Sequence, residues 1–353
     1  MLNYIKDIKL ENFRNYKRKK FSDFGEFNIL VGPNAVGKTN VIEAIQLMTE
    51  LSSFRHPRLS DIILKGAEWS RIEANTEEDN LSLFIDNKKT YKLNYKNKNY
   101  KGLYPSVTFT PDDLIMVKGG NSLKRDAIDS LGGQLSKNYY TVRKDYSKAL
   151  RQKNKLLKET ISNKTLQSIN DVLVVTGAQL ICYRHELLKK VEPILADFYK
   201  KITGSNEELS IAYEPSFVID TYERDTVRDN FKNSLEANIL DEQNKRKSII
   251  GPHADRIKFM LNEEDAQTFA SQGQQRSIAL AFKLTELQLI ENILNKTPIL
   301  LLDDVMSELD ASRRKMLIEF VKDKTQVFVT TTNLDYFEKE ALEKANIIEL
   351  CHK

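Results

Sequence analysis

Three features of the sequence predict an α/β fold that carries a long helical insertion. Phe27 to Val31 is an apolar, strand-like run that ends in a glycine loop, and Asn40 to Leu51 then repeats apolar residues with the helical period. Pro298 to Leu302 is a short apolar run typical of a strand buried in a parallel sheet. Residues 126–201 carry the helical period over a long stretch. We therefore expect a parallel sheet whose sequence is interrupted by a helical lobe.

The remaining segments fit around this frame. Alternating apolar residues from Ile5 to Phe13 predict a first strand, and period two between Arg71 and Lys101 predicts an antiparallel ribbon. After the helices we expect strand-like pieces near 210–220 and 249–261, helices over 274–294 and 311–323, and a strand over 326–330. The expected domains are residues 1–105, an inserted helical lobe over 106–245, and residues 246–353.

The first half of the helical stretch carries a narrow apolar seam. Its residues recur every seven positions, with two tyrosines between them: Leu135, Val142, Ala149 and Leu156, then Tyr139 and Tyr146. Such a seam is suited to pairing with another helix. The second half is apolar at comparable spacing, so the sequence predicts an antiparallel helical arm.

Composition excludes several classes of protein. The chain has 353 residues, 41% of them hydrophobic and 29% charged, which describes a globular chain rather than a disordered one. No apolar run reaches the roughly 20 residues that a bilayer span needs, and the start lacks an apolar secretory core, so we expect a cytoplasmic protein with no membrane partner. Cys182 and Cys351 are too few for a disulfide framework, and no metal-ligand spacing of histidines and cysteines appears.

The glycine loop after the first buried strand has a specific pattern. Residues 32–39 read GPNAVGKT, which matches the phosphate-binding loop with two spaced glycines before Lys and Thr. In that pattern backbone N–H groups and the helix N-terminus bind phosphates, Lys38 reaches the β- and γ-phosphates, and Thr39 coordinates magnesium. An ordinary glycine-rich turn is the alternative. The candidate nucleotide-binding residues here are Gly32, Pro33, Asn34, Ala35, Val36, Gly37, Lys38, Thr39 and Asn40.

Two acids follow the buried strand near residue 300. A nucleotide-binding fold needs a carboxylate there to organise magnesium, and Asp303 is the candidate. Asp304 would then act as general base on the attacking water, which makes Asp304 and Lys38 the candidate catalytic residues. The alternative is a pair of acids that caps the strand.

A second anion site is predicted at the start of a long apolar helix. Ser271, Gly273 and Gln274 form a Ser-x-Gly-Gln turn, where a hydroxyl and free N–H groups can bind an anion. A plain capped helix is the alternative.

Positive charge is concentrated in one segment. Residues 118–159 carry eleven Lys or Arg against four acids, a local balance of +7 in a chain of net charge +4. Five cations at spacings of four, three, four and three fall on one helix face, opposite the apolar seam: Lys144, Lys148, Arg151, Lys155 and Lys158. Such a stripe could follow nucleic-acid phosphates, although a solvated face is the alternative.

Taken in order, these motifs resemble the ATPase heads of the ABC type, in the branch that includes the SMC proteins. Within that branch the chain is similar to the RecF family of bacterial recombination mediators almost from end to end. Further segments that carry this likeness are LENFRNY at 10–16, FTPDDLIMVKG at 109–119, GPH at 251–253 and LLDDVMSELD at 301–310. The implied fold is an α/β ABC-type ATPase head with an inserted helical arm lobe.

The resemblance implies an ATP-dependent clamp. ATP and Mg²⁺ would be its cofactors, and the Ser271, Gly273 and Gln274 turn of one subunit would meet the nucleotide held by Lys38 of another, giving an ATP-dependent homodimer. Family members bind single-stranded and gapped duplex DNA, hydrolyse ATP slowly, and work with RecR and RecO to load the RecA recombinase. One alternative is an SMC-like structural clamp. The other is a transport-type ATPase subunit, and the basic arm and the LENFRNY start argue against this second alternative.

The chain also departs from the pattern of these families. Ala35 stands where a glycine is usual, Ala254 where an arginine is usual, and Asp304 where transport ATPases carry glutamate. Arg55 and Arg58 follow the first helix, where a contact to nucleotide or DNA and a plain surface role are both open.

Overall fold

The structure is a computed structural model that describes residues 5–55, 57–86, 88–94, 96–97, 104–159, 163–322 and 324–351. The chain forms two compact units: Met1–Leu114 with Glu286–Lys353, called unit 1 here, and Ile115–Thr285, called unit 2. Among the described residues, no helix combines the length and apolar character that crossing a bilayer demands.

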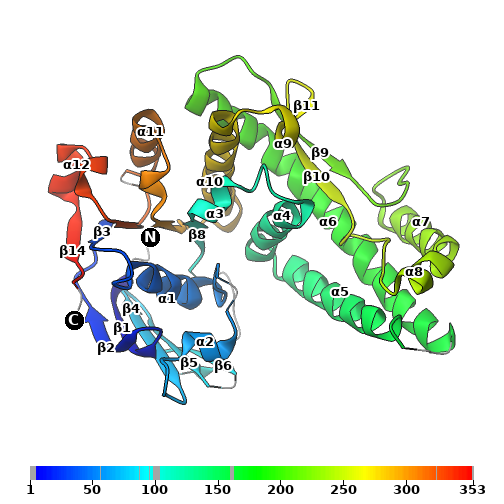
Figure 1. The fold of residues 1–353 in the computed structure, drawn as a ribbon, viewed down its shortest axis with the longest axis horizontal. Helices are drawn as coiled ribbons and strands as arrows, with labels where there is room; N and C mark the ends of the chain where they lie inside the picture. The colour runs from blue at the N-terminus through cyan, green and yellow to red at the C-terminus, as the bar shows by residue number, and fades with distance from the viewer. Residues whose placement is uncertain are drawn as a thin grey trace. The chain divides into compact units, whose positions relative to one another are not determined.

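Unit 1 is built on a five-stranded sheet in which all neighbouring strands run parallel (Figure 1). Its order is β14 (Asn346–Glu349), β3 (Phe27–Val31), β13 (Val327–Thr331), β12 (Ile299–Asp303) and β8 (Ser106–Phe109). Strands β12 and β13 are buried along their whole length, as expected for strands covered on both faces. The predicted α/β class is confirmed.

A second, antiparallel sheet completes unit 1. It runs β2 (Tyr16–Phe21), β1 (Ile5–Phe13), β4 (Ser70–Thr76), β5 (Asn80–Ile85), β6 (Lys89–Leu93) and β7 (Lys96–Asn97). Apolar side chains of this sheet pack with α1 (Lys38–Glu50) and with β12 and β13 in one core. The remaining helical segments of unit 1 are α2 (Leu59–Ile62), α3 (Pro111–Leu114), η1 (Val305–Ser307), α11 (Ala311–Val321), η2 (Leu334–Tyr336) and α12 (Lys339–Lys344).

Unit 2 holds the helical arm. It consists of α4 (Asn121–Leu135), α5 (Lys137–Leu156), α6 (Asn163–Thr203), α7 (Arg224–Ala237), α8 (Ile239–Lys245) and α9 (Ala266–Phe269), with a small antiparallel sheet of β11 (Glu264–Asp265), β10 (Arg256–Leu261) and β9 (Leu209–Glu214). Helix α10 (Gln272–Leu294) begins in unit 2 and ends in unit 1. The arm predicted from the seam is present, because α5 packs along α6 (Figure 1). The side chains of Tyr139, Tyr146 and Ala149 on α5 are buried.

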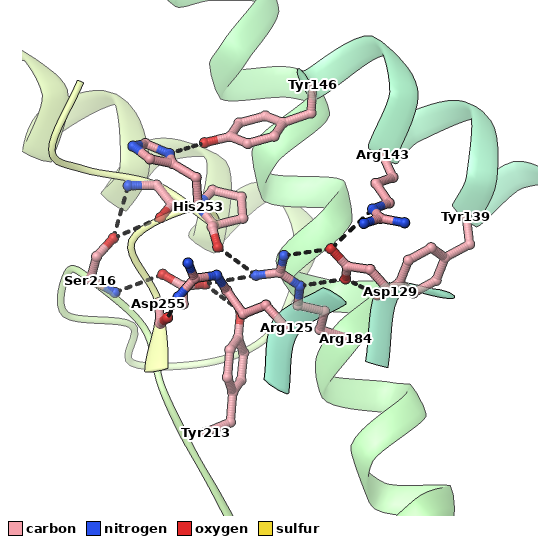
Figure 2. A network of polar contacts seen from close by, with 12 residues as sticks. Arg125, Asp129, Tyr139, Arg143, Tyr146, Arg184, Tyr213, Ser216, His253 and Asp255 are labelled. Atoms are coloured by element: carbon pink, nitrogen blue, oxygen red, sulfur yellow. Dashed lines mark hydrogen bonds and ion pairs between the residues drawn. The ribbon is translucent and has the colours of Figure 1, made fainter. Parts of the chain in front are cut away.

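A buried ionic network ties the arm to the small sheet (Figure 2). Arg184 on α6 donates two hydrogen bonds of 2.8 Å to the carboxylate of Asp129 on α4 and one of 2.6 Å to the carbonyl of Pro252. The Asp255 carboxylate, at the entry to β10, accepts from Tyr213 on β9 at 2.5 Å. Burial alone would raise the pKa of Asp129, but the Arg184 charge holds it below its usual value.

The boundaries of these units differ from those expected at residues 106 and 245. Strand β8 belongs to the parallel sheet beside β12, and the compact helical unit begins only at Ile115. It also extends to Thr285, because β10 pairs with β9 and so joins the helical unit. A four-residue strand gives no local signal of the strand it pairs with, which is why the sequence prediction placed β8 in the lobe.

Candidate nucleotide-binding site

The glycine loop lies between β3 and α1, as the sequence predicts. Gly37 has φ of 112°, in the left-handed region that favours glycine. A Cβ at Gly37 would lie 2.6 Å from the Tyr16 hydroxyl, and one at Gly32 would collide with the carbonyl oxygen of Leu350. Gly32 is therefore required by close approach, and Gly37 by close approach as well as by conformation.

Ala35 is the strained position of this loop. Its φ is 65°, so its backbone lies in the left-handed region that L-residues with a Cβ avoid. Glycine at this position, as is usual in the resembling family, would carry no such cost.

Lys38 is folded onto the loop that it follows. Its Nζ donates to the carbonyl oxygens of Gly32 at 2.7 Å and Pro33 at 2.8 Å. Burial lowers the pKa of this ammonium, while the negative charges of Asp304 and Asp303 act to raise it. Lys38 and the two acids therefore share one electrostatic environment.

The acids occupy the end of β12. Asp303 is buried, and it accepts a hydrogen bond of 2.7 Å from the Thr330 hydroxyl on the neighbouring strand β13. Burial raises the pKa of Asp303, while hydrogen bonds from Thr330 and Thr39 act to lower it. The Thr39 hydroxyl and the Asp303 carboxylate thus come together from two distant segments, and both are oxygen donors of the kind Mg²⁺ prefers.

Asp304 is one residue further on and half-buried. Its backbone has φ of 54°, and its N–H donates to the Thr330 hydroxyl at 2.9 Å. Burial raises the pKa of this carboxyl, and the Lys38 charge lowers it.

A pocket of about 200 Å³ opens between these groups. It is lined by Asn34, Ala35, Gly37, Lys38, Thr39, Asn40, Arg55 and Asp304. The backbone N–H groups at the start of α1 and the cations Lys38 and Arg55 suit the phosphates of a nucleotide. The oxygens of Thr39 and Asp303 suit the Mg²⁺ that accompanies it. Of the predicted residues, Asp303 lies next to this pocket through its hydrogen bond with Thr39, whereas Gly32, Pro33 and Val36 do not line it.

Arg55 is a lining residue whose role the sequence left open. Its Nη1 donates to Asn40 Oδ1 at 2.7 Å and pairs with the buried carboxylate of Glu43 at 3.3 Å. Arg55 lies in a loop with no period of its own, so the pattern gave no reason to prefer it over Arg58. Arg58 is exposed and does not line the pocket.

The LENFRNY segment braces the same loop. Arg14 binds Glu43 of α1 with two hydrogen bonds of 2.8 and 2.6 Å, Asn15 donates to the carbonyl of Val36, and the Tyr16 hydroxyl donates to that of Gly37. Burial raises the pKa of Tyr16 to about 12, so this hydroxyl stays a donor at neutral pH. The segment therefore holds the loop in place through its hydrogen bonds to Val36 and Gly37.

The Ser271 turn lies in unit 2, at the first turn of α10. Ser271 is exposed, and Gly273 and Gln274 are half-buried. Ser271 Oγ accepts from the N–H of Gln274 at 3.3 Å, so the hydroxyl caps α10, which is the alternative given for this turn, and the anion site stays a prediction.

The basic stripe lies on α5 as predicted, with one difference, at Lys158. Lys144, Lys148, Arg151 and Lys155 are exposed, and no ion pair involves them among the described residues. Lys158 is also exposed, but it lies in the turn beyond the end of α5. Lys153 faces inward instead and pairs with Glu242 of α8 at 2.5 Å.

Comparisons with known proteins define the class first. A family model described as the RecF/RecN/SMC N terminal domain matches residues 4–350. The chain resembles a solved SMC head bound to the C-winged helix domain of ScpA with a TM-score of 0.53 at 15% identity, covering 98% of this chain and 93% of that one, which shows the fold alone. The fold is that of RecF and SMC head ATPases.

Closer relatives define the family. The DNA replication and repair protein RecF of Cyanothece sp. is 33% identical, covering 98% of this chain and 96% of that protein, and that of Bacillus cereus strain G9842 is 35% identical with the same coverage. A solved structure of the recombination mediator protein RecF with ATP in the RecFOR pathway matches with a TM-score of 0.87 at 31% identity, covering 96% of this chain and 94% of that one. The chain belongs to the RecF family of DNA replication and repair proteins.

Proposed function

We propose that this chain is an ATP-switched DNA-binding protein of replication and recombinational repair that dimerises when it binds ATP. The observation that carries this proposal is the pocket lined by Lys38, Thr39, Arg55 and Asp304, with Asp303 bonded to Thr39 next to it. The exposed Ser271 turn and the exposed stripe on α5 support the dimer and the DNA contact respectively.

ATP binds at the glycine loop in this account. Lys38 and the N-terminus of α1 hold the phosphates, and Thr39 and Asp303 hold Mg²⁺. When bound, Mg²⁺ neutralises negative charge on the phosphates. Asp304 accepts a proton from the attacking water at its carboxylate, a role that its raised pKa favours.

Dimerisation follows from the Ser271 turn. Ser271, Gly273 and Gln274 of one copy meet the γ-phosphate held by Lys38 of a second copy, so the dimer has a higher affinity for ATP than for ADP. By linkage, ATP favours the dimer, and slow hydrolysis resets it.

The DNA contact runs along α5. The stripe presents five cations to phosphates without any group placed to read bases, which suits recognition of single-stranded and gapped duplex DNA through the backbone. The bound DNA stimulates hydrolysis, and RecR and RecO are the partners with which the dimer helps to load RecA. The RecF structures of the RecFOR pathway support this assignment.

Two variants test the site in its two parts. Lys38→Ala removes the ammonium that holds the phosphates, and we expect ATP binding about 10- to 100-fold weaker, as for loss of a charge-assisted hydrogen bond. Ser271→Arg leaves the loop untouched, so the monomer should bind ATP normally but fail to dimerise. Fluorescent-nucleotide titration and sedimentation measure the two effects.

The control is Lys65→Ala, which removes an exposed cation of unit 1 outside the pocket. It should change neither property. Normal ATP binding by the Lys38 variant, or wild-type dimers from the Ser271 variant, would refute the respective half of the proposal.

A further inference from the structure

The start of α10 is closed by a reciprocal pair of hydrogen bonds. The N–H of Gln274 donates to Ser271 Oγ at 3.3 Å, and the N–H of Ser271 donates to Gln274 Oε1 at 2.7 Å. This is a capping box of the Ser-x-x-Gln type. The orientation of the Gln274 amide therefore decides whether the N–H of Ser271 has its acceptor.

A third residue sets that orientation. The Gln274 amide nitrogen Nε2 donates to Glu207 Oε1 at 2.5 Å. An ionised carboxylate only accepts hydrogen bonds, so it requires the nitrogen of the amide to face it. The amide oxygen is then left facing Ser271, as the capping box requires.

Glu207 is itself held at the end of the helical arm. Its Oε2 accepts from the hydroxyl of Tyr199, near the end of α6, at 2.8 Å, and from the Ser205 hydroxyl at 2.9 Å. Burial alone would raise the pKa of Glu207, but the hydrogen bonds from Tyr199, Ser205 and Gln274 lower it below its usual value. At neutral pH this acceptor is ionised.

We propose that Glu207 is a positioning residue that fixes Gln274 and, through it, the Ser271 hydroxyl for contact with the nucleotide of a second copy. In this arrangement Ser271 uses its N–H on Gln274 and a lone pair of its hydroxyl on the helix cap. Its hydroxyl proton is left to donate to a phosphate oxygen. The inference rests on the proposed ATP-dependent dimer, and it adds a residue 67 positions away from the turn it orients.

Glu207→Ala tests this role in the full-length chain. With the carboxylate gone, the Gln274 amide loses the constraint on its orientation, and we expect ATP-dependent dimerisation about tenfold weaker, the loss of one charge-assisted hydrogen bond. ATP binding to the monomer should stay unchanged, because the glycine loop lies in unit 1. Glu207→Gln keeps an acceptor, but its amide can also donate and so no longer imposes one orientation on Gln274, and it should recover only part of the dimer affinity.

A double-mutant cycle separates positioning from a direct effect. If Glu207 acts through Gln274, then Glu207→Ala should add little further loss of dimer affinity once Gln274→Ala is present. Glu208→Ala is the matched control, because this neighbouring glutamate is exposed and uses only its backbone in the hydrogen bonds described here. Additive losses in the double variant would overturn the inference.

Hydrogen exchange tests the contact without any dimer. In the monomer, Glu207→Ala should speed exchange of the amides at 271–275, while Glu208→Ala should not. Unchanged exchange together with unchanged dimerisation would overturn the role of Glu207. A wild-type chain that never dimerises with ATP would instead refute the proposed function, and the exchange result would still decide whether Glu207 orders the turn.

Discussion

Asp304 combines position and electrostatics that suit a general base. It lies directly after the buried strand β12, half-buried beside the pocket that Lys38 lines. Burial raises the pKa of its carboxyl, although the Lys38 charge lowers it. A carboxylate with a raised pKa takes up a proton more readily than an exposed one.

Asp304→Asn should therefore separate ATP binding from hydrolysis. We expect hydrolysis at least about 100-fold slower in single-turnover assays, with ATP-bound dimers accumulating. The wild-type rate should fall as pH drops through the raised pKa of Asp304, at a pH above the ordinary value of 3.8, and the variant should lack this acid limb.

The control is Asp112→Asn, an exposed acid of unit 1 that should leave the rate unchanged. An Asp304 variant that hydrolyses ATP normally would remove the base role. Unaltered DNA binding and dimer lifetime in a variant that no longer hydrolyses would favour the structural-clamp alternative, in which the ATP site serves assembly alone.

Ala35 offers a test of backbone strain. The left-handed conformation destabilises a folded residue with a Cβ by about 1–2 kcal/mol. Glycine avoids this cost, but its greater freedom in the unfolded chain lowers the stability by about 0.5–1 kcal/mol. Ala35→Gly should thus stabilise the chain by about 0.5–1 kcal/mol in urea denaturation. Ala345→Gly, at a φ of −80°, should destabilise it instead; a destabilising Ala35→Gly would contradict the strain.

At the scale of elements, α5 has two faces with separate tasks. Its inner face buries Tyr146 and Ala149, and its Lys153 forms a buried ion pair with Glu242. Its outer face exposes Lys148 and Arg151 without ion pairs among the residues the structure describes. Because the packing face is distinct, the outer cations can be replaced without disturbing the arm.

The double variant Lys148→Ala/Arg151→Ala should weaken duplex binding to a similar degree for all sequences. Each lost phosphate contact lowers the slope of log K against log salt by about 0.9, so we expect a slope smaller by about 1.8. Titrations at several salt concentrations measure it. Lys190→Ala on α6 removes an exposed cation outside the stripe and should leave the slope unchanged; an unaltered slope in the double variant would make the stripe a plain solvated face.

Elements with a strong local signal could be predicted from the sequence. The loop before α1 has its glycines, strand β12 is a continuous apolar run, and the helices α5 and α10 combine an apolar period with a capping serine. Strand β8 and the contact of Glu207 with Gln274 could not, because both depend on pairing between segments far apart in sequence. The positive φ of Ala35 could not be predicted either, because it depends on the path of the loop in three dimensions.

At the scale of the whole molecule, the two units divide the proposed functions. Unit 1 contains the nucleotide pocket, and unit 2 contains the Ser271 turn, the basic stripe and the Asp129–Arg184–Asp255 network (Figure 2). The sequence predicted the glycine loop, the two acids, the Ser271 turn and the stripe but not the ionic network, and it placed the turn in the ATPase head. Contacts of β10 with β9 join it instead to the helical unit.

Sedimentation of the wild-type chain tests the central claim most directly. The chain is measured with ADP, with ATP and Mg²⁺, and with ATP, Mg²⁺ and gapped duplex DNA. The account predicts monomers with ADP, dimers with ATP, and dimers that sediment with the gapped DNA. A chain that stays monomeric with ATP would contradict it, because the Ser271 turn would then complete no second nucleotide site.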